Sequence, residues 1–283
     1  MNCRHCNKEL KSIFLDLGKA PPSNAYLSKD DLEKEELYFP LKVMVCNHCW
    51  LVQTLDYANA EELFSEDYAY FSSTSSSFLA HAKEYSKNII RTLLLDEDSF
   101  VVEIASNDGY LLKNFVESNI PCLGIEPTDS TADEAEKLGI PVMREFFGEN
   151  VAINLSESEK KADLILGNNV YAHVPDINDF TKGLTALLKP EGTITLEFPH
   201  LMRLLEFSQF DTVYHEHFSY LSLHAVTSIF KMAGLRIYNV EELSTHGGSI
   251  RVFGCHASAE IAEDNSVKVM LEQEHRFGIT NMN

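Results

Sequence analysis

The 283-residue sequence has few basic side chains and no long apolar run. It contains 23 lysines and arginines against 43 aspartates and glutamates, which gives a formal net charge of −20. Such a surface repels nucleic acids and anionic membranes unless a local basic patch intervenes, and the sequence shows no such patch. No apolar run approaches the roughly 18–20 residues that a membrane-spanning helix needs. These absences disfavour nucleic acids and membranes as partners.

The first six residues also lack the apolar segment of a secretory signal, so we expect a cytoplasmic location. Six cysteines in such a chain favour metal ligation or burial over disulfide bonds. Cys122 and Cys255 lie in apolar, strand-like runs and are expected to be core thiols.

The other four cysteines form two Cys-x-x-Cys pairs, Cys3/Cys6 and Cys46/Cys49, with 39 residues between them. Four thiolates complete a tetrahedral Zn²⁺ site and leave no open coordination position, which predicts a structural zinc centre. The interval exceeds the usual spacing of about 15–20 residues, but the entropic cost of closing a loop grows slowly with its length. Two unrelated thiol pairs, a redox motif, or ligation by His5 or His48 remain as alternatives.

From residue 100 onward, short apolar runs alternate with longer amphipathic ones. This alternation predicts an α/β fold with a parallel, doubly wound sheet. The run Lys189-Pro190-Glu191-Gly192 predicts a helix stop followed by a turn. The last two apolar runs predict a closing antiparallel hairpin. The predicted strands are 100–104, 122–125, one at 142, 163–166, 193–198, 236–240 and 249–255, and the predicted helices are 111–118, 130–138 and 176–188.

We divide the chain accordingly. Residues 1–55 are predicted to form the zinc-binding module, and residues 56–98 a helical connector that contributes to the active site. The main α/β domain is predicted to span residues 99–260.

A sharp turn, Ala105-Ser106-Asn107-Asp108-Gly109, follows the first predicted strand of that domain. Such a turn lets the backbone approach a ligand closely and points a helix N-terminus at it. Glu126 ends the next strand, where a carboxylate can accept both hydroxyls of a ribose. The motif G-x-G-x-x-G is absent, so a dinucleotide fits less well.

The run from Glu103 to Gly109, followed by Glu126, resembles motif I and the acidic strand end of class I methyltransferases. The resemblance implies a Rossmann-like sheet and S-adenosylmethionine as cofactor, with Glu103 near the methionine amino group and Glu126 on the ribose. Ala105 stands where many of these enzymes have glycine. Residues that merely join a strand to a helix in another α/β protein are the alternative. The implied cofactor-binding residues are Glu103, Ala105, Asn107, Asp108, Gly109, Glu126, Phe147 near the adenine (or only packed in the core), and Asn168 and Asn169 on the methionine side.

Three further polar segments follow predicted strands, at residues 168–175, 211–218 and 246–248. The carboxyl ends of parallel strands meet at one edge of a sheet, so the first two segments could face one crevice.

The cysteine pairs, the run from Glu103, the motif Tyr214-x-Glu216-His217-Phe218 and the motif His246-Gly247-Gly248 occur in this order in one family. The chain resembles the sugar-nucleotide C-methyltransferases of deoxysugar biosynthesis, which act on nucleotide-linked 4-keto-6-deoxysugars. Members of that family continue into a C-terminal domain, of which residues 261–283 would be the start. Diphosphate contacts could come from Arg144, Arg203 or Arg251, or from a further domain. The resemblance places the acid/base residues at Tyr70, His173, Tyr214, Glu216 and His217.

Carbon methylation explains why such groups are needed. A base with a pKa near neutrality removes the proton beside the ketone, a role that suits His217. A tyrosine or His173 would donate to the enolate oxygen, and Glu216 would orient the histidine. Alternatively, the segment is a half-exposed strand with Tyr214 and Glu216 on one face and His217 on the other, or it is a metal site.

Other functions remain open at this point. The chain could be an O- or N-methyltransferase acting on a small metabolite, which needs no enolising base. It could also be a non-catalytic cofactor-binding protein or a zinc-ribbon adaptor. His173 could be a packed histidine, and His246 could only shape its glycine turn. The sequence does not predict an oligomeric state.

Overall fold

The computed structural model describes residues 1–23, 26–55, 71–158 and 160–281. Within this part of the chain, the main sheet has seven strands in the order β10-β11-β8-β7-β4-β5-β6. Strands β6, β5, β4, β7 and β8 are parallel, and β11 and β10 close the sheet as an antiparallel hairpin. The predicted α/β fold and its closing hairpin are therefore confirmed. The bounds are β4 Val101–Ile104, β5 Cys122–Ile125, β6 Val142–Met143, β7 Ala162–Asn168, β8 Leu188–Pro199, β10 Leu235–Leu243 and β11 Ser249–His256.

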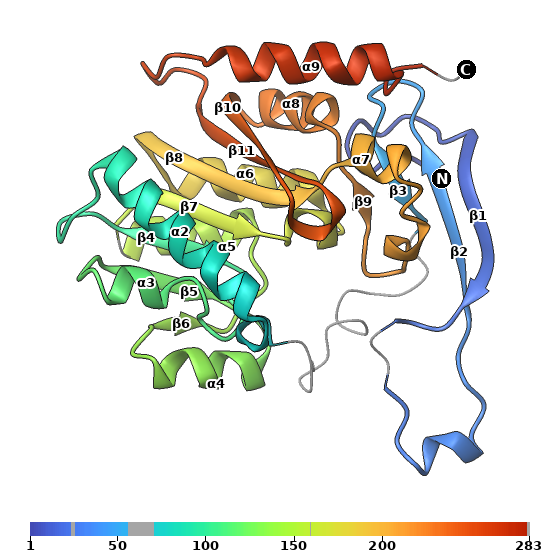
Figure 1. The fold of residues 1–283 in the computed structure, drawn as a ribbon, viewed down its shortest axis with the longest axis horizontal. Helices are drawn as coiled ribbons and strands as arrows, with labels where there is room; N and C mark the ends of the chain where they lie inside the picture. Colours follow the sequence, from blue (N-terminus) through green and yellow to red (C-terminus); the bar gives the residue numbers. More distant parts are fainter. Residues whose placement is uncertain (24–25, 56–70, 159, 282–283) are drawn as a thin grey trace.

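Helices cover both faces of this sheet (Figure 1). Successive side chains of β4 point to opposite faces of the sheet. Val101 packs in one apolar cluster with α2 and α3, and Val102 packs in another with α5, α6 and α8. Strands that are buried on both faces read as continuous apolar runs. The helices are α2 Ser76–Leu93, α3 Lys113–Val116, α4 Asp129–Lys137, α5 Glu149–Ser158, α6 Ile177–Leu187, α7 Leu201–Glu206, α8 Leu223–Met232 and α9 Asn265–Phe277.

Polar side chains set where several of these helices begin. Ser75 accepts from the Phe78 amide before α2, Asp176 from the Asp179 amide before α6, and Ser222 from the Ala225 amide before α8. Such N-caps satisfy amides that have no partner within the helix. They hold the ends of α2 and α6 beside the carboxyl edge of the sheet.

The predicted turn at residues 189–192 is wrong. Helix α6 ends at Leu187, and Leu188 already pairs with Ala162 of β7. The residues up to Gly192 form an irregularity within β8, after which regular pairing resumes at Thr193. Pro190 cannot donate a ladder hydrogen bond, which is compatible with such a bulge.

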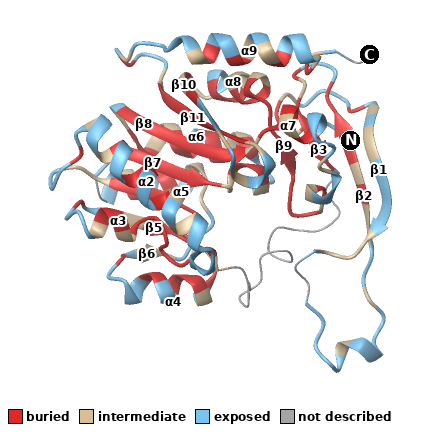
Figure 2. Ribbon diagram, in the orientation of Figure 1, coloured by how far each residue is buried: buried red, intermediate tan, exposed pale blue. Residues whose placement is uncertain are grey.

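The N-terminal residues form a second sheet with the order β1-β2-β3-β9. Strand β9, Ser219–Tyr220, comes from the far end of the chain and pairs with β3. Figure 2 shows buried residues on β2, β3 and β9, whereas β1 is mostly exposed. This small sheet is thus joined to the segment that carries the predicted acid/base residues. Its other strands are β1 Ser12–Ala20, β2 Phe39–Val45 and β3 Val52–Thr54.

Five single-turn 3-10 helices occur in the described part: Asp31–Glu33, Ser72–Thr74, Tyr171–His173, Phe210–Thr212 and Thr245–Gly247. Among the described helices, none is both long enough and apolar enough to cross a membrane. The core thiols Cys122 and Cys255 are buried, as the sequence predicted.

Candidate functional site

The turn after β4 has an unusual backbone. Ala105 has φ +56°, Asn107 +50° and Gly109 +76°. Left-handed backbone costs a non-glycine residue about 1–2 kcal/mol, so neighbouring contacts must hold the turn. The Cβ that Ala105 adds is thus tolerated in a left-handed conformation. A Cβ on Gly109 would collide with the side chains of Ile140 and Ala135.

Glu126 fixes this turn from the end of β5. One carboxylate oxygen accepts from the Asn107 amide at 2.9 Å, and the other accepts from the Thr128 amide at 3.0 Å. The side chain is buried, yet it lines a cavity at the carboxyl edge of the sheet. An ionised carboxylate has about four acceptor positions, so Glu126 can still accept from a ligand.

That cavity has a volume of about 820 Å³. It brings together residues that the sequence assigned separately to a cofactor and to an acceptor. The cofactor group is Ala105, Asn107, Glu126, Phe147, Asn168 and Asn169, and the acceptor group is His173, Tyr214, Glu216 and His217.

Three predicted residues lie behind the cavity wall. Glu103 is buried, and its pKa is raised well above the usual value, first by burial and then by the charges of Glu126 and Asp108. Asp108 accepts from the Ser73 amide at 3.0 Å and so holds the segment before α2. Gly109 provides close packing at the turn. Tyr70 lies outside the described residues.

Asn168 ends β7 and Asn169 follows it, and both have buried polar side-chain atoms. The side-chain Nδ2 and Oδ1 atoms of Asn168 and the Oδ1 atom of Asn169 have no hydrogen-bond partner among the described residues. Asn169 has φ +56°, and its backbone amide donates to the Glu197 backbone carbonyl at 2.7 Å. Buried polar groups are nearly always hydrogen-bonded, so these atoms fit a polar ligand in the cavity.

Tyr214 and His217 form a hydrogen-bonded pair. The segment is a turn in which the His217 amide bonds the Tyr214 carbonyl at 3.1 Å, so the alternative of a strand with opposite faces is wrong. The Tyr214 hydroxyl donates to Nε2 of His217 at 2.8 Å, and Nδ1 of His217 donates to the Thr212 carbonyl at 2.8 Å. Since a carbonyl only accepts, Nδ1 carries the proton and Nε2 the lone pair.

The His217 pKa differs from the near-neutral value expected for a base. It is lowered well below the usual 6.5, first by burial and then by the neighbouring His173. The ring therefore stays neutral, with its Nε2 lone pair directed at Tyr214.

His173 is held in a similar way. Its Nδ1 donates to the Glu216 carbonyl at 2.9 Å, and burial lowers its pKa to about 4. Its Nε2 thus carries a lone pair, which does not suit the expected role of donor to an enolate. The Glu216 backbone orients His173, while the Glu216 carboxylate accepts from Ser23 at 3.0 Å. Ser23 was missed because only a Pro-Pro turn precedes it in sequence.

The cavity is acidic. Among the described residues, no lysine or arginine lines it. The three arginines considered for diphosphate binding are each paired with carboxylates. Arg144 pairs with Asp129, Asp133 and Glu136, Arg203 with Glu206 and Glu242, and Arg251 with Glu197 and Glu241.

The four cysteines meet at a second site. The sulfurs of Cys3, Cys6, Cys46 and Cys49 all lie within 4.8 Å of one another. A tetrahedral ion with Zn–S bonds of about 2.3 Å needs sulfurs about 3.8 Å apart. Gln53 donates to the Cys3 sulfur at 3.1 Å, as a partner outside the ligand set would. The group therefore has the geometry of a closed metal centre.

The histidines within the two Cys-x-x-Cys pairs are not part of the sulfur cluster. The His5 ring lies 2.9 Å from the Asn178 side-chain oxygen, and His48 is exposed. In the described part of the chain, the four cysteines are the only cluster that could hold a metal, so ligation by the histidines near Tyr214 gains no support.

Comparison with known proteins defines the class. A family model described as "Putative zinc binding domain" matches residues 3–64, and one described as "Methyltransferase domain" matches residues 78–240. The second match covers more than half of the chain. The protein belongs to the methyltransferase family.

One curated relative is the C-methyltransferase NovU of Streptomyces niveus, which is 33% identical over 277 residues. The alignment covers 98% of this chain and 66% of NovU. The chain is also similar to a solved S-adenosylmethionine-dependent methyltransferase from Clostridium acetobutylicum, with 13% identity and a TM-score of 0.49 over 62% of this chain and 90% of that one. The magnesium protoporphyrin IX methyltransferase of Synechocystis gives 14% identity and a TM-score of 0.49 over 63% and 84%.

Proposed function

We propose that the protein is an S-adenosylmethionine-dependent C-methyltransferase that acts on a nucleotide-linked 4-keto-6-deoxysugar through an enolate. The observation that carries the proposal is the neutral Tyr214–His217 pair in the same cavity as Glu126. The name of NovU as a C-methyltransferase supports transfer to carbon.

The cavity fits the cofactor in size, charge and polarity. Glu126 would accept from the ribose hydroxyls. The side-chain amide of Asn168 and Oδ1 of Asn169, which have no partner among the described residues, would meet the amino-acid end. The acidic wall suits a sulfonium cation. When bound, the cofactor supplies an electrophilic methyl group.

The protein's own groups prepare the carbon. Nε2 of His217 takes the proton beside the ketone, either directly or through the Tyr214 hydroxyl. The C–H electron pair forms a C=C bond, and the carbonyl electrons move to oxygen as the enolate. That carbon becomes the nucleophile, and proximity to the methyl group supplies much of the rate. The desolvated imidazole is neutral before this step, so its Nε2 lone pair can take the proton, and the ring carries that proton afterwards.

The acidic wall also bears on the acceptor. A diphosphate would be repelled by Glu145, Asp176, Asp179 and Asp211, whereas a sugar ring offers hydroxyls that these carboxylates can accept from. We therefore place only the ketosugar ring in this cavity. The diphosphate would be bound by groups outside the described lining.

The four cysteines would hold one structural Zn²⁺. Hydrogen bonding from Cys49 lowers the pKa of Cys3 to about 4, and the same contact raises the pKa of Cys49, so the two sulfurs share one proton that a bound metal would replace. The site would stabilise the small sheet and take no part in the chemistry.

The test is incubation with S-adenosylmethionine and a thymidine-diphosphate 4-keto-6-deoxyhexose in deuterated water, read by mass spectrometry. We expect a mass gain of one methyl group and, without cofactor, entry of solvent deuterium into the sugar. His217→Asn should abolish both. Methylation that survives in His217→Asn would instead indicate transfer to oxygen or nitrogen. Absence of both events in the wild type would refute the proposal.

A further inference from the structure

An enolate oxygen needs a hydrogen-bond donor, and two of the three histidines in the cavity are poorly placed to supply it. His173 and His217 each give their Nδ1 proton to a backbone carbonyl and keep a lone pair on Nε2. His246 is the third histidine that lines the cavity. Among the described residues, neither of its ring nitrogens makes a hydrogen bond. Its N–H is therefore available to a ligand.

The backbone of His246 must be held in place. His246 has φ +49°, and Gly247 and Gly248 follow with +75° and +122°. A histidine in left-handed backbone is strained, and such strain persists only where the surroundings impose it. Gln209 donates to the Gly247 carbonyl at 2.8 Å. The His246 ring lies edge-on to the Phe78 ring, with the two ring centroids 5.8 Å apart.

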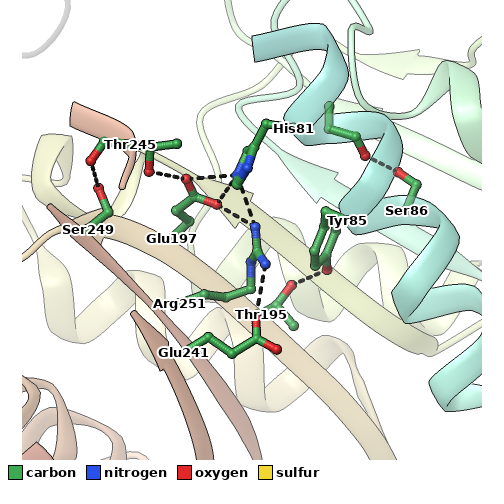
Figure 3. Close-up of polar contacts among 10 residues, drawn as sticks. His81, Tyr85, Ser86, Thr195, Glu197, Glu241, Thr245, Ser249 and Arg251 are labelled. Carbon is green, nitrogen blue, oxygen red and sulfur yellow. Dashed lines mark hydrogen bonds and ion pairs between the residues drawn. The ribbon is translucent and has the colours of Figure 1, made fainter. Parts of the chain in front are cut away.

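A buried carboxylate fixes the residue before it. The Thr245 hydroxyl donates to Oε1 of Glu197 at 2.9 Å (Figure 3). Oε2 of Glu197 accepts from Nη2 of Arg251 at 2.6 Å and lies 2.9 Å from Nε2 of His81. Burial raises the pKa of Glu197, but His81 and Arg251 outweigh it and leave the pKa below its usual value. The acceptor for Thr245 is thus a carboxylate anion.

Three elements hold this carboxylate still. Glu197 of β8 and Arg251 of β11 are direct partners in the antiparallel register. The Arg251 guanidinium lies 4.2 Å from the ring centre of Tyr85 on α2 and also bonds Glu241 at 3.1 Å. Figure 3 shows these side chains converging from α2 and from the two strands. The anchor of Thr245 is therefore part of the rigid sheet.

We propose that His246 is a further catalytic residue that donates an N–H hydrogen bond to the acceptor's carbonyl oxygen, and that Glu197 positions it through Thr245. The inference rests on the proposed function. As the carbonyl electrons move to oxygen, the His246 N–H stabilises the negative charge, and the proton stays on nitrogen. The charge disappears when the carbon accepts the methyl group and the C=O bond reforms.

The test compares variants of the full chain that differ by one contact. Thr245→Val removes the hydroxyl donor at nearly constant shape, and Thr245→Ser restores it. Glu197→Gln weakens the acceptor, and Glu241→Gln is the matched control because Glu241 touches Arg251 but not Thr245. The readouts are kcat, KM, calorimetric binding of S-adenosylhomocysteine, and the NMR resonances of the His246 imidazole, assigned with His246→Asn.

We expect His246→Asn to lower kcat about 10²-fold, as for loss of one positioned donor. Thr245→Val should lower kcat by roughly tenfold because the His246 ring is no longer held in position. KM and S-adenosylhomocysteine binding should be nearly unchanged. Thr245→Ser should recover the wild-type rate. The His246 resonances should shift in Thr245→Val and Glu197→Gln but not in Glu241→Gln.

The two proposals fail in different ways. If the wild type methylates the ketosugar and Thr245→Val matches it in kcat and His246 resonances, the inference is overturned and the proposed function stands. If the wild type transfers no methyl group, both catalytic assignments fall. The resonances then still decide whether Glu197 positions His246, because they need no turnover.

Discussion

The histidines of the cavity owe their neutral state to burial. The pKa of His173 is lowered from 6.5 to about 4 because its charged form would lose hydration. In the unfolded chain, by contrast, this ring takes a proton below pH about 6.5. Between these two values the unfolded state binds a proton that the native state does not.

The free energy of unfolding should therefore fall as the pH drops from about 6.5 to about 4. With about 1.4 kcal/mol per pKa unit, His173 accounts for roughly 3 kcal/mol of that loss. His173→Gln can still donate to the Glu216 carbonyl but does not titrate, so its profile should be flatter. Urea unfolding of both proteins across this window measures the difference. Parallel profiles would show that His173 is not the group responsible.

Among the elements, α9 is tied to the start of α8 by a buried carboxylate, that of Glu274. The Glu274 carboxylate accepts from the amides of Leu223 and His224 at the start of α8, at 2.6 and 2.8 Å. It also bonds His200, directly after β8, at 2.7 Å. A carboxylate at a helix N-terminus satisfies unpaired amides and interacts favourably with the helix dipole.

Glu274→Ala should lower the free energy of unfolding by about 3 kcal/mol, since it leaves buried donors without an acceptor. The matched control is Glu272→Ala on the same helix, where an exposed pair with Arg276 contributes about 0.3–0.5 kcal/mol. Chemical denaturation of both variants compares them. Equal losses would mean that α9 contributes through general packing.

Local patterns predicted the central elements and failed where pairing is long-range. The apolar runs at β4, β5 and β7 located those strands because each is buried on both faces. Strand β9 has two residues and pairs with β3 across most of the chain, and its own sequence contains no strand signal. The helix stop was predicted correctly, but the start of β8 was misplaced because pairing of Leu188 with Ala162 overrides the local turn signal.

The site could be predicted in composition but not in geometry. Most of the residues that the sequence assigned to the site line the cavity. The contact between Tyr214 and His217 depends on a turn, and alternation of period two would have separated them. The tautomers of His173 and His217 are set by carbonyls that come into reach only after folding.

In the molecule as a whole, the small sheet β1-β2-β3-β9, which lies next to the four cysteines, forms part of the support of the cavity. Gln53 bonds the Cys3 sulfur, and the next residue, Thr54, donates through its hydroxyl to the His217 carbonyl at 3.1 Å. The Thr54 amide bonds the Phe218 carbonyl at 3.1 Å. Arg4, between the first two cysteines, donates to the Pro175 carbonyl at 2.6 Å. A metal at the cysteines would therefore hold the segment that carries the Tyr214–His217 pair.

We expect one Zn²⁺ per chain by elemental analysis, lost in Cys46→Ser and retained in Cys122→Ala, a buried thiol away from the cluster. Zinc binding contributes free energy to folding, so loss of the metal should weaken the pairing of β3 with β9. Hydrogen exchange at the amide of Thr54, which donates to the Phe218 carbonyl, should then quicken. Glu126 and Asn107 lie directly beyond β5 and β4 of the main sheet, away from the cysteines, so binding of S-adenosylhomocysteine should persist. Exchange that stays slow in Cys46→Ser would mean that packing alone holds the His217 turn.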